Sequence, residues 1–502
     1  MLDGVRPSGA RRSWWLRETL ATEPPELAGA APPLMGSSTA DVVVVGGGYT
    51  GLWTAWRLSE LEPGARIVLL EADICGGGPS GRNGGFVSGW WDELPTLIGR
   101  HGPVGALATA RAIDEAVDSI GDWCVTNGVD AWFTKAGALS VSAAPAQDAA
   151  WEQAVEACRA LGVGQEYAAL SADAVHAKVV SPVFRGGVFM RGAATIQPAA
   201  LARGLRRVLL NRGVSIHERT RVVELDGERP GALGRVGAAG RRAPDGRAGR
   251  PVRVRTVSAR GSGEVIAHAA VVGLNAWAAA WPSFGRRLVT WSSYIVLTEP
   301  IPDRLAELGW IGGEGIADGR FTLHYLRTTP DGRIALGGGG GRAGFGGRIG
   351  PAFTEDLASV RRAAAGLRRL FPILRDVRID DAWGGPIDIT ADHLPMFGSM
   401  PGRPVHFGHG YSGNGVAPSV VGGRILAALA VDRHDDPALA LPLVGAVPRA
   451  FPPEPLRYAG ARIVREAIVR TESAEERGAR PGRLMREISR LPRRLGYHLG
   501  PE

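Results

Sequence analysis

The segment that most constrains the fold of this chain is the glycine-rich run 46–51, Gly-Gly-Gly-Tyr-Thr-Gly, between an apolar strand and an amphipathic helix. The run fits the pattern G-x-G-x-x-G. In that pattern Gly46 allows a tight turn, Gly48 lets the backbone approach a pyrophosphate, and Gly51 lets the helix pack closely against the strand. The N–H groups at the start of the helix then attract phosphate. The dinucleotide contacts predicted from this loop are Gly46, Gly48, Tyr49, Thr50 and Gly51.

A second strand, Arg66 to Leu70, follows the helix and ends at Glu71. Because the chain contains 72 glycines, the glycine pattern alone is a weak signal. Glu71 strengthens it, since a carboxylate about 20 residues after the last glycine of the motif accepts both ribose hydroxyls and repels a 2′-phosphate. This β-α-β unit therefore predicts an adenine dinucleotide site, without indicating which dinucleotide.

Composition excludes several other classes of protein. The chain has 502 residues, of which 45% are hydrophobic and 22% charged, which is typical of a globular protein with room for two domains. No apolar run approaches the ~20 residues of a membrane helix, and the N-terminus lacks a signal pattern. We therefore predict a cytoplasmic protein without a transmembrane segment.

The net charge and the cysteines concern two further classes, proteins that bind nucleic acid and proteins that bind metal. The formal charge is +8, but only two of the 58 Lys and Arg residues are lysines, Lys135 and Lys178. An arginine excess beside abundant Ala, Gly and Pro is typical of codon bias, so we do not expect nucleic-acid binding. The cysteines Cys75, Cys124 and Cys158 fit no metal or disulfide framework. We expect reduced thiols and no metal.

Hydrophobic periodicity predicts an α/β fold with two domains. The first is a Rossmann-like dinucleotide-binding domain on a parallel sheet, discontinuous in sequence. The second is an α+β substrate domain on a mostly antiparallel sheet. We assign residues 39–100, 190–280 and 380–432 to the first domain and residues 101–189 and 281–379 to the second, with an N-terminal arm at 1–38, a disordered insertion at 226–251 and a basic tail at 446–502. The tail predicts one or two surface helices, with membrane contact as the alternative.

A second loop decides between nicotinamide and flavin. Residues 76–85 read Gly-Gly-Gly-Pro-Ser-Gly-Arg-Asn-Gly-Gly. Together with the segment from Gly46 to Glu71, this loop resembles the D-amino-acid-oxidase-like superfamily of FAD enzymes, and most closely the branch that contains gamma-glutamylputrescine oxidase. The resemblance covers roughly residues 40 to 430 and includes the segments Thr195–Pro198, Thr220–Val222, Val271–Trp277, Trp383–Gly385, Thr390–Pro395 and Gly408–Gly415.

The resemblance implies an FAD site. Ser80 and the segment Asn83, Gly84 and Gly85 would lie beside the isoalloxazine, and the backbone of Val222 would meet the adenine. Residues 413–416 would open a helix aimed at the N1/C2=O edge, where reduced flavin is anionic and a helix N-terminus stabilises the charge. The residues of that helix start are Gly413, Asn414, Gly415 and Val416. We expect non-covalent FAD, with Cys75 as the residue placed for a covalent link.

The resemblance also implies the chemistry, which is hydride transfer to flavin N5 from an amine or an N-substituted amino acid, giving an imine that hydrolyses. Tyr325 would cap the flavin and Arg327 would hold a substrate carboxylate in a bidentate pair. Trp90, with Trp91, would wall the pocket. The alternatives are a half-buried strand tyrosine, an ion-pair arginine and core tryptophans. His393 and His409 are expected to be structural.

The electron acceptor stays open. Relatives that resemble sarcosine oxidase place a lysine near the flavin to activate oxygen, but the comparable strand from Arg333 to Leu336 has none. Pro79 and Asn414 also depart from the usual residues of the family. The alternatives are an oxidase that uses oxygen, a dehydrogenase that passes electrons to a quinone or carrier protein, and a flavin-binding regulatory module without turnover. The sequence does not indicate the oligomeric state.

Overall fold

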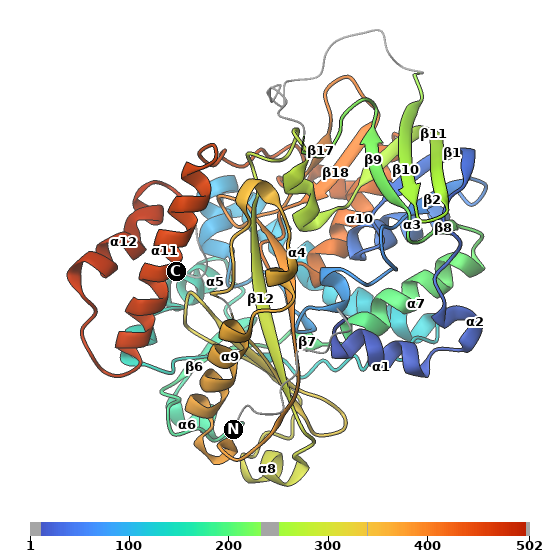
Figure 1. The fold of residues 1–502 in the computed structure, drawn as a ribbon. Coiled ribbons are helices and arrows are strands. Elements are labelled where there is room, and N and C mark those ends of the chain that lie inside the picture. Colours follow the sequence, from blue (N-terminus) through green and yellow to red (C-terminus); the bar gives the residue numbers. More distant parts are fainter. Residues whose placement is uncertain (1–11, 232–249, 339, 498–502) are drawn as a thin grey trace.

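The computed structural model describes residues 12–231, 250–338 and 340–497. They form two eight-stranded sheets and one two-stranded sheet, with helices against the outer faces of the larger sheets (Figure 1). Most of the predicted insertion at 226–251 falls on residues 232–249, which lie outside the described residues.

The first sheet is built on parallel strands. Its order is β17-β18-β11-β1-β2-β8, and β10 and β9 extend it beside β11. Strands β1, β2, β8, β11 and β18 run parallel to their neighbours in this order, whereas β17, β10 and β9 join antiparallel. The bounds are β1 Gly36–Val45, β2 Ile67–Leu70, β8 Ser215–His217, β9 Arg221–Leu225, β10 Val252–Ser258, β11 Gly261–Val272, β17 Met396–Ser399 and β18 Val405–His409.

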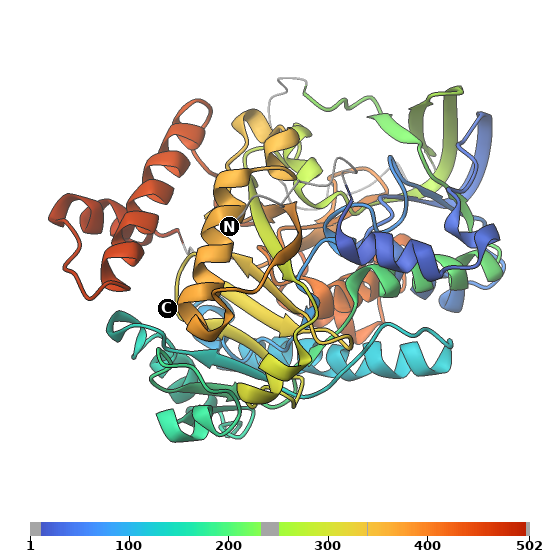
Figure 2. The same cartoon turned by 60° about the horizontal axis from the view of Figure 1, so that its bottom comes forward.

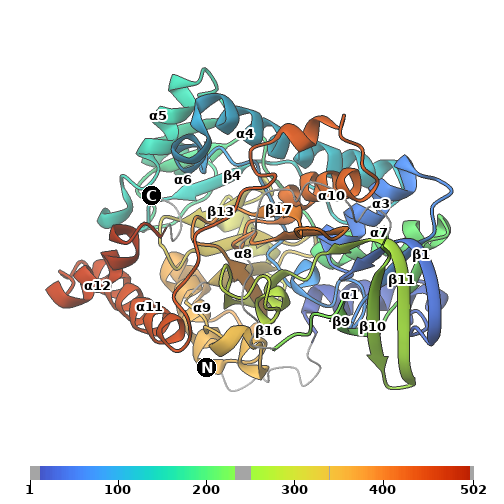
Figure 3. The same ribbon diagram turned by 90° about the horizontal axis from the view of Figure 1, so that it is seen from above.

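Three helices cover this sheet, namely α3 (Tyr49–Leu61), α7 (Pro198–Asn211) and α10 (Val416–Ala430) (Figure 3). The apolar side chains of β1 that face them, Val42 and Val44, pack against Leu52 of α3 in one buried core. β1 extends back to Gly36, because residues 36–40 already pair with β11. The predicted Rossmann-like sheet is confirmed.

The second sheet has the order β16-β12-β15-β14-β13-β4-β6-β5. All its pairs are antiparallel except β13 with β4, so the predicted mostly antiparallel sheet is confirmed. Helix α9 (Leu357–Leu370) covers its outer face. The bounds are β4 Ala138–Val141, β5 Tyr167–Leu170, β6 Gly187–Met190, β12 Val289–Thr298, β13 Gly315–Asp318, β14 His324–Thr328, β15 Ile334–Gly338 and β16 Ile379–Ile389.

Strand β16 corrects one predicted boundary. Residues 380–432 were assigned to the nucleotide-binding domain, but 380–389 belong to β16, which pairs with β12 along its whole length in the second sheet. The chain therefore re-enters the first sheet at β17.

Shorter elements connect the two sheets. The small sheet pairs β3 (Phe86–Val87) with β7 (Ala194–Thr195). Helix α4 (Leu94–Thr126) changes direction at Gly102, whose φ is +69°. The remaining helices between the sheets are α5 (Glu152–Ala160), α6 (Ala172–His176) and α8 (Pro302–Glu307).

The described part of the N-terminal arm contains two helices, and the first of them packs into the body of the protein. The two helices are α1 (Trp14–Thr22) and α2 (Pro25–Ala28). Trp15 is fully buried and lies edge-on to Trp383 of β16, with ring centroids 5.7 Å apart. Ser13 donates to the carbonyl of Gly81, and Arg17 pairs with Asp381. The arm therefore joins the loop at 76–85 to the edge of the second sheet.

The basic tail forms two helices, α11 (Leu456–Glu475) and α12 (Arg483–Arg494), which pack against each other as a hairpin beside the second sheet (Figure 2). Among the described residues, no helix is both long enough and apolar enough to cross a membrane.

Candidate active site

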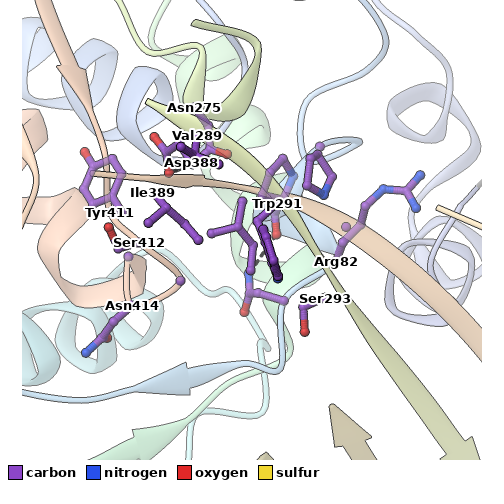
Figure 4. Close-up of a pocket in the computed structure, with 18 of the residues that line it drawn as sticks. Arg82, Asn275, Val289, Trp291, Ser293, Asp388, Ile389, Tyr411, Ser412 and Asn414 are labelled. Carbon is purple, nitrogen blue, oxygen red and sulfur yellow. Dashed lines mark hydrogen bonds between the residues drawn. The ribbon is translucent and has the colours of Figure 1, made fainter. Parts of the chain in front are cut away.

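A cavity of about 1300 Å³ runs between the two sheets. Its lining includes the glycine loop, Glu71, the loop at 76–85, the N-terminus of α10, one face of the second sheet and the C-terminal hairpin. Figure 4 shows the part where β12, β16 and the α10 loop meet. This volume exceeds the usual ~300–1,000 Å³ of a small-molecule pocket, so there is room for a cofactor together with a substrate.

The glycine loop forms a cradle that side chains would fill. Gly46 has φ +113°, and a Cβ there would lie 2.5 Å from the carbonyl oxygen of Gly273. A Cβ at Gly51 would collide with the carbonyl of Gly46. Gly46, Gly48, Tyr49 and Thr50 line the cavity, whereas Gly51 supports the turn from behind. The loop thus has the close backbone approach that a pyrophosphate requires.

Glu71 lies at the end of β2 and faces the same cavity. Its carboxylate oxygens accept the backbone N–H groups of Gly47 and Asp73, each at 2.7 Å. Burial raises the pKa of Glu71 to about 7. Val222, on the neighbouring β9, also lines the cavity. This end therefore has the carboxylate and the backbone strand that an adenosine would contact.

In the second loop, side chains fix the backbone. Ser80 Oγ accepts the N–H of Tyr49 at 2.8 Å, which joins the two glycine-rich loops. Asn83 Oδ1 accepts the N–H of Gly85 at 2.7 Å, and its amide donates to the carbonyls of Pro79 and Ser80. Ser80, Asn83 and Gly84 line the cavity, whereas Gly85 lies behind them.

The start of α10 points into the cavity. Gly413 adopts φ +96°, and a Cβ at Gly415 would lie 2.9 Å from Cβ of Tyr411. Asn414 donates its N–H to the carbonyl of Tyr411 at 3.0 Å, and residues 413–416 all line the cavity (Figure 4). The helix N-terminus therefore faces the space where the resemblance puts the flavin edge.

Asp388, which the sequence interpretation missed, lies beside that helix start (Figure 4). It is fully buried and accepts hydrogen bonds from the Asn275 side chain at 2.9 Å and the Gly410 N–H at 2.5 Å. Burial raises the pKa of Asp388 to about 7. Only its position just before Thr390, the start of a motif used for the resemblance, pointed to it.

The inner face of the second sheet forms the opposite wall. Successive inward residues of β12, which are Val289, Trp291, Ser293 and Ile295, line the cavity with the period of two expected for a strand. Tyr325 of β14 lies beside them, with its hydroxyl 2.9 Å from Ser293 Oγ. Burial raises the pKa of Tyr325 to about 12, so its hydroxyl stays protonated. The sequence analysis did not single out Trp291 or Ser293 as site residues.

Tyr325 also touches the second loop. A Cβ at Gly84 would come within 2.7 Å of the Tyr325 ring, and Phe86 packs edge-on against that ring with centroids 5.8 Å apart. The structure thus places Tyr325 against the loop expected to hold the flavin.

Arg327 and Trp90 lie outside the lining of the cavity. Arg327 is 2% exposed and does not line the cavity; it donates to the carbonyls of Ile196 and Thr328 and lies 5.6 Å from the centre of the Trp15 ring. Burial lowers the pKa of Arg327 to about 10. Trp90 is buried in the main core, and Trp91 donates its indole N–H to Asp114 at 2.9 Å. The substrate roles expected for Arg327 and Trp90 therefore do not fit this geometry. Trp90 is a core tryptophan, whereas Arg327 is held by backbone carbonyls and the Trp15 ring instead of the expected ion pair.

Asp92, next to these tryptophans, does line the cavity. Its Oδ1 is inaccessible to solvent and has no hydrogen-bond partner. Burial raises the pKa of Asp92 to about 6. The sequence offered no signal for it beyond proximity to Trp91.

The sequence analysis also named two histidines and Cys75, and the structure places the three differently. His409 is buried between Phe284 and Phe407, and burial lowers its pKa to about 3, so it is neutral. His393 lines the cavity. Cys75 is buried below Gly47 and is absent from the cavity lining, which supports non-covalent FAD.

A glycine cradle on a parallel sheet, facing an antiparallel sheet across one cavity, defines the class of two-domain dinucleotide-dependent oxidoreductases. The family model described as FAD dependent oxidoreductase matches residues 41–429. The chain therefore belongs to this family, and its cofactor is FAD, as predicted.

Individual relatives agree with this assignment. The chain is 27% identical to a probable oxidoreductase, OrdL, from Haemophilus influenzae, over 79% of this chain and 84% of that protein. It is 28% identical to the gamma-glutamylputrescine oxidoreductase of Escherichia coli, over 78% of this chain and 84% of that protein. Glycine oxidase from Geobacillus kaustophilus has a similar fold, with a TM-score of 0.59 and 18% identity, over 78% of this chain and 95% of that structure.

Proposed function

We propose that this protein oxidises the C–N bond of an amine, or of an N-substituted amino acid, with FAD as cofactor. The observation that carries the proposal is the single cavity that runs from the dinucleotide cradle at Gly46 to Tyr325 and Trp291 on the second sheet. A substrate beside Tyr325 would thus lie next to the loop of Gly84. The name of the Escherichia coli relative, gamma-glutamylputrescine oxidoreductase, supports an amine substrate.

The chemistry requires little from the side chains beyond positioning. When bound, FAD accepts a hydride from the carbon next to the substrate nitrogen, leaving a C=N bond that water hydrolyses. The residues of this chain hold the amine close and exclude water. Trp291 and Ile295 form an apolar wall that excludes water, and the hydroxyl of Tyr325, fixed by Ser293, holds the amine.

An acidic group on the cavity wall favours an amine over an amino acid, and Arg82, which also lines the cavity, already donates to the carbonyls of Gly77 and Gly384. The side chain of Asp92 lines the cavity, and a carboxylate there suits an ammonium group. Asp92 would also accept the proton that the ammonium loses on becoming the reactive neutral amine. Arg327, expected to hold a carboxylate, lies outside the cavity lining.

A second candidate differs only in the electron acceptor. Neither lysine lines the cavity: Lys135 pairs with Asp118, and Lys178 pairs with Glu314 at 3.2 Å. This favours a dehydrogenase that passes electrons to a quinone or carrier protein instead of oxygen. We also propose a cytoplasmic location, supported by three unpaired, buried cysteines.

The test is the visible spectrum of the purified protein. Flavin bands near ~370 and ~450 nm should bleach on anaerobic addition of one or more amines from a panel of primary amines and N-methyl amino acids. Oxygen uptake with the same amine identifies an oxidase, and its absence identifies a dehydrogenase. A stable spectrum with every compound would overturn the proposal and favour the non-catalytic flavin-binding module.

A further inference from the structure

The C-terminal hairpin closes one end of the cavity, although it lies outside the part of the chain that matches the family. The family match ends at residue 429, whereas α11 begins at Leu456. Residues from α11, from α12 and from the segment after α12 nevertheless line the same cavity as the dinucleotide loops. Figure 3 shows the hairpin beside the second sheet, on the side away from α3 and α7.

Buried ion pairs fix α11 to the second sheet. Glu472 accepts the N–H of Thr322 at 3.0 Å and the Thr322 hydroxyl, and it pairs with Arg320 at 3.1 Å. Glu476 pairs with Arg320 at 3.2 Å and with Arg369 of α9 at 2.8 Å. Because these groups are largely buried, their separation would leave uncompensated charge. Helix α11 is therefore held firmly against the second sheet.

Further contacts fix both ends of the hairpin. Arg465 donates to the carbonyls of Gly340 and Gly341 at 2.8 and 2.7 Å. Arg457 pairs with Glu454 at 2.8 Å and donates to the carbonyl of Leu288 at 3.2 Å. Beyond α12, Tyr497 stacks on Phe451 with centroids 5.4 Å apart.

The surface that the hairpin turns to the cavity is apolar. Its charged members, Arg457 and Arg465, are already engaged by carbonyls and by Glu454, so they offer little to a ligand. Phe321 and Leu323, next to the anchored Thr322, continue the apolar wall toward Tyr325. The apolar lining of the hairpin region comprises Phe451, Pro452, Leu456, Ala461, Val464, Ile468, Leu491, Pro492 and Leu495.

We propose that the hairpin forms an apolar subsite for the substituent of the substrate, so that the substrate is an amine with an extended aliphatic or aromatic chain and no charged far end. This inference rests on the proposed function, because it locates the reactive nitrogen near Tyr325. A second carboxylate or ammonium would find no free counter-charge at the hairpin and would lose its hydration there.

The test compares chain lengths. Half-saturating concentrations for anaerobic flavin bleaching are measured with butylamine and octylamine. Because each buried CH₂ is worth about 0.8 kcal/mol, or about fourfold in affinity, we expect octylamine to half-saturate the protein at a concentration at least about tenfold lower. Equal values for the two amines would overturn the subsite.

Two neighbouring residues of α11 make a matched pair. Val464 lines the cavity, whereas Ile463 is 56% exposed and does not. Val464→Asp should raise the half-saturating concentration of octylamine to about that of butylamine. It should change the butylamine value by no more than about twofold, because only the longer chain reaches the hairpin. Ile463→Asp should change neither value. Equal effects of the two substitutions would contradict the assignment.

Binding without turnover separates this inference from the proposed function. Octyltrimethylammonium and butyltrimethylammonium carry no nitrogen lone pair and cannot form the imine, so their binding is followed by the shift they cause in the flavin spectrum. Tighter binding of the octyl compound, lost in Val464→Asp, supports the subsite even if no amine is oxidised. Equal binding of the two ions, or none of either, overturns it.

Discussion

Gly84 lies where the second loop meets Tyr325. Gly84→Ala puts a Cβ 2.7 Å from the Tyr325 ring, so the ring or the loop has to move. We expect the purified variant to retain FAD but to bleach at least about tenfold more slowly, since misplacement of about 1 Å can cost a hundredfold in rate.

Gly78→Ala is the matched control within the same loop, because its Cβ would make only an ordinary contact, 3.6 Å from Trp277. Equal bleaching rates for the two variants would show that Tyr325 does not position the substrate against this loop.

Asp92 gives a prediction about pH. Burial raises the pKa of Asp92 to about 6, so below that pH the carboxyl is neutral and attracts the ammonium less. We expect kcat/KM for the amine to fall as the pH drops through about 6. Asp92→Asn should lower kcat/KM at pH 7 by about tenfold, from the loss of a charge-assisted hydrogen bond, and should remove the inflection. Asp118→Asn, on the exposed side of α4, is the control.

For single residues, the sequence is most informative where a residue's geometry is determined by its neighbours along the chain. The roles of Gly46 and Gly48 follow from neighbouring residues, and the loop adopts the geometry they require. Arg327 shows the limit of such local prediction, because the aromatic ring that covers it belongs to Trp15, near the N-terminus. Asp92 shows another limit, because nothing in its neighbours along the chain indicates that its side chain lines the cavity.

The same distinction holds for the secondary-structure elements. Strand β2 was predicted to within about one residue, because the signals for its period and its end lie within the strand. The assignment of β16 to the wrong sheet has a non-local cause, since its pairing with β12 joins residues about 90 positions apart. The two-sheet architecture was predicted, but the closure of the cavity by α11 was not, because the ion pairs that hold it are tertiary.

The anchoring of α11 predicts a local loss of stability. Glu472→Gln removes the charge that faces Arg320 and weakens two hydrogen bonds from Thr322. We expect the attachment of the hairpin to weaken by about 3 kcal/mol, as when one partner of a buried ion pair is removed. Trypsin should then cleave after Arg477, between α11 and α12, markedly faster than in the parent protein.

Glu466→Gln, on an exposed stretch of the same helix, should leave cleavage unchanged. Cleavage of Glu472→Gln at the parental rate would mean that the hairpin is held by other contacts.

For the whole molecule, buried carboxyls link stability to pH. Burial raises the pKa of Asp388 to about 7, so the folded state keeps a proton that the unfolded state loses at a lower pH. Asp388 therefore stabilises the fold below its unfolded pKa, and this contribution is lost as the pH rises toward 7. His406 and His409, whose pKa values burial lowers to about 4 and about 3, act in the opposite direction.

Comparison with Asp388→Asn isolates the carboxyl, because the histidine contributions cancel. For the FAD-free proteins, the stability of the variant relative to the parent should rise between pH 5 and pH 7, by at most about 1.4 kcal/mol per pH unit. Urea unfolding at pH 5, 6, 7 and 8 measures this difference. A difference that stays constant over this range would mean that Asp388 ionises normally in the folded protein.

The buried position of α1 has a consequence for synthesis on the ribosome. With nine residues, α1 is shorter than the roughly 12–15 residues that an isolated helix needs in water, and it contacts Gln197, Arg327 and Trp383. Trp383 lies more than 350 residues after α1 in the chain, so it is made much later. We therefore expect α1 to fold late, with Trp14 and Trp15 accessible to chaperones until Trp383 has emerged.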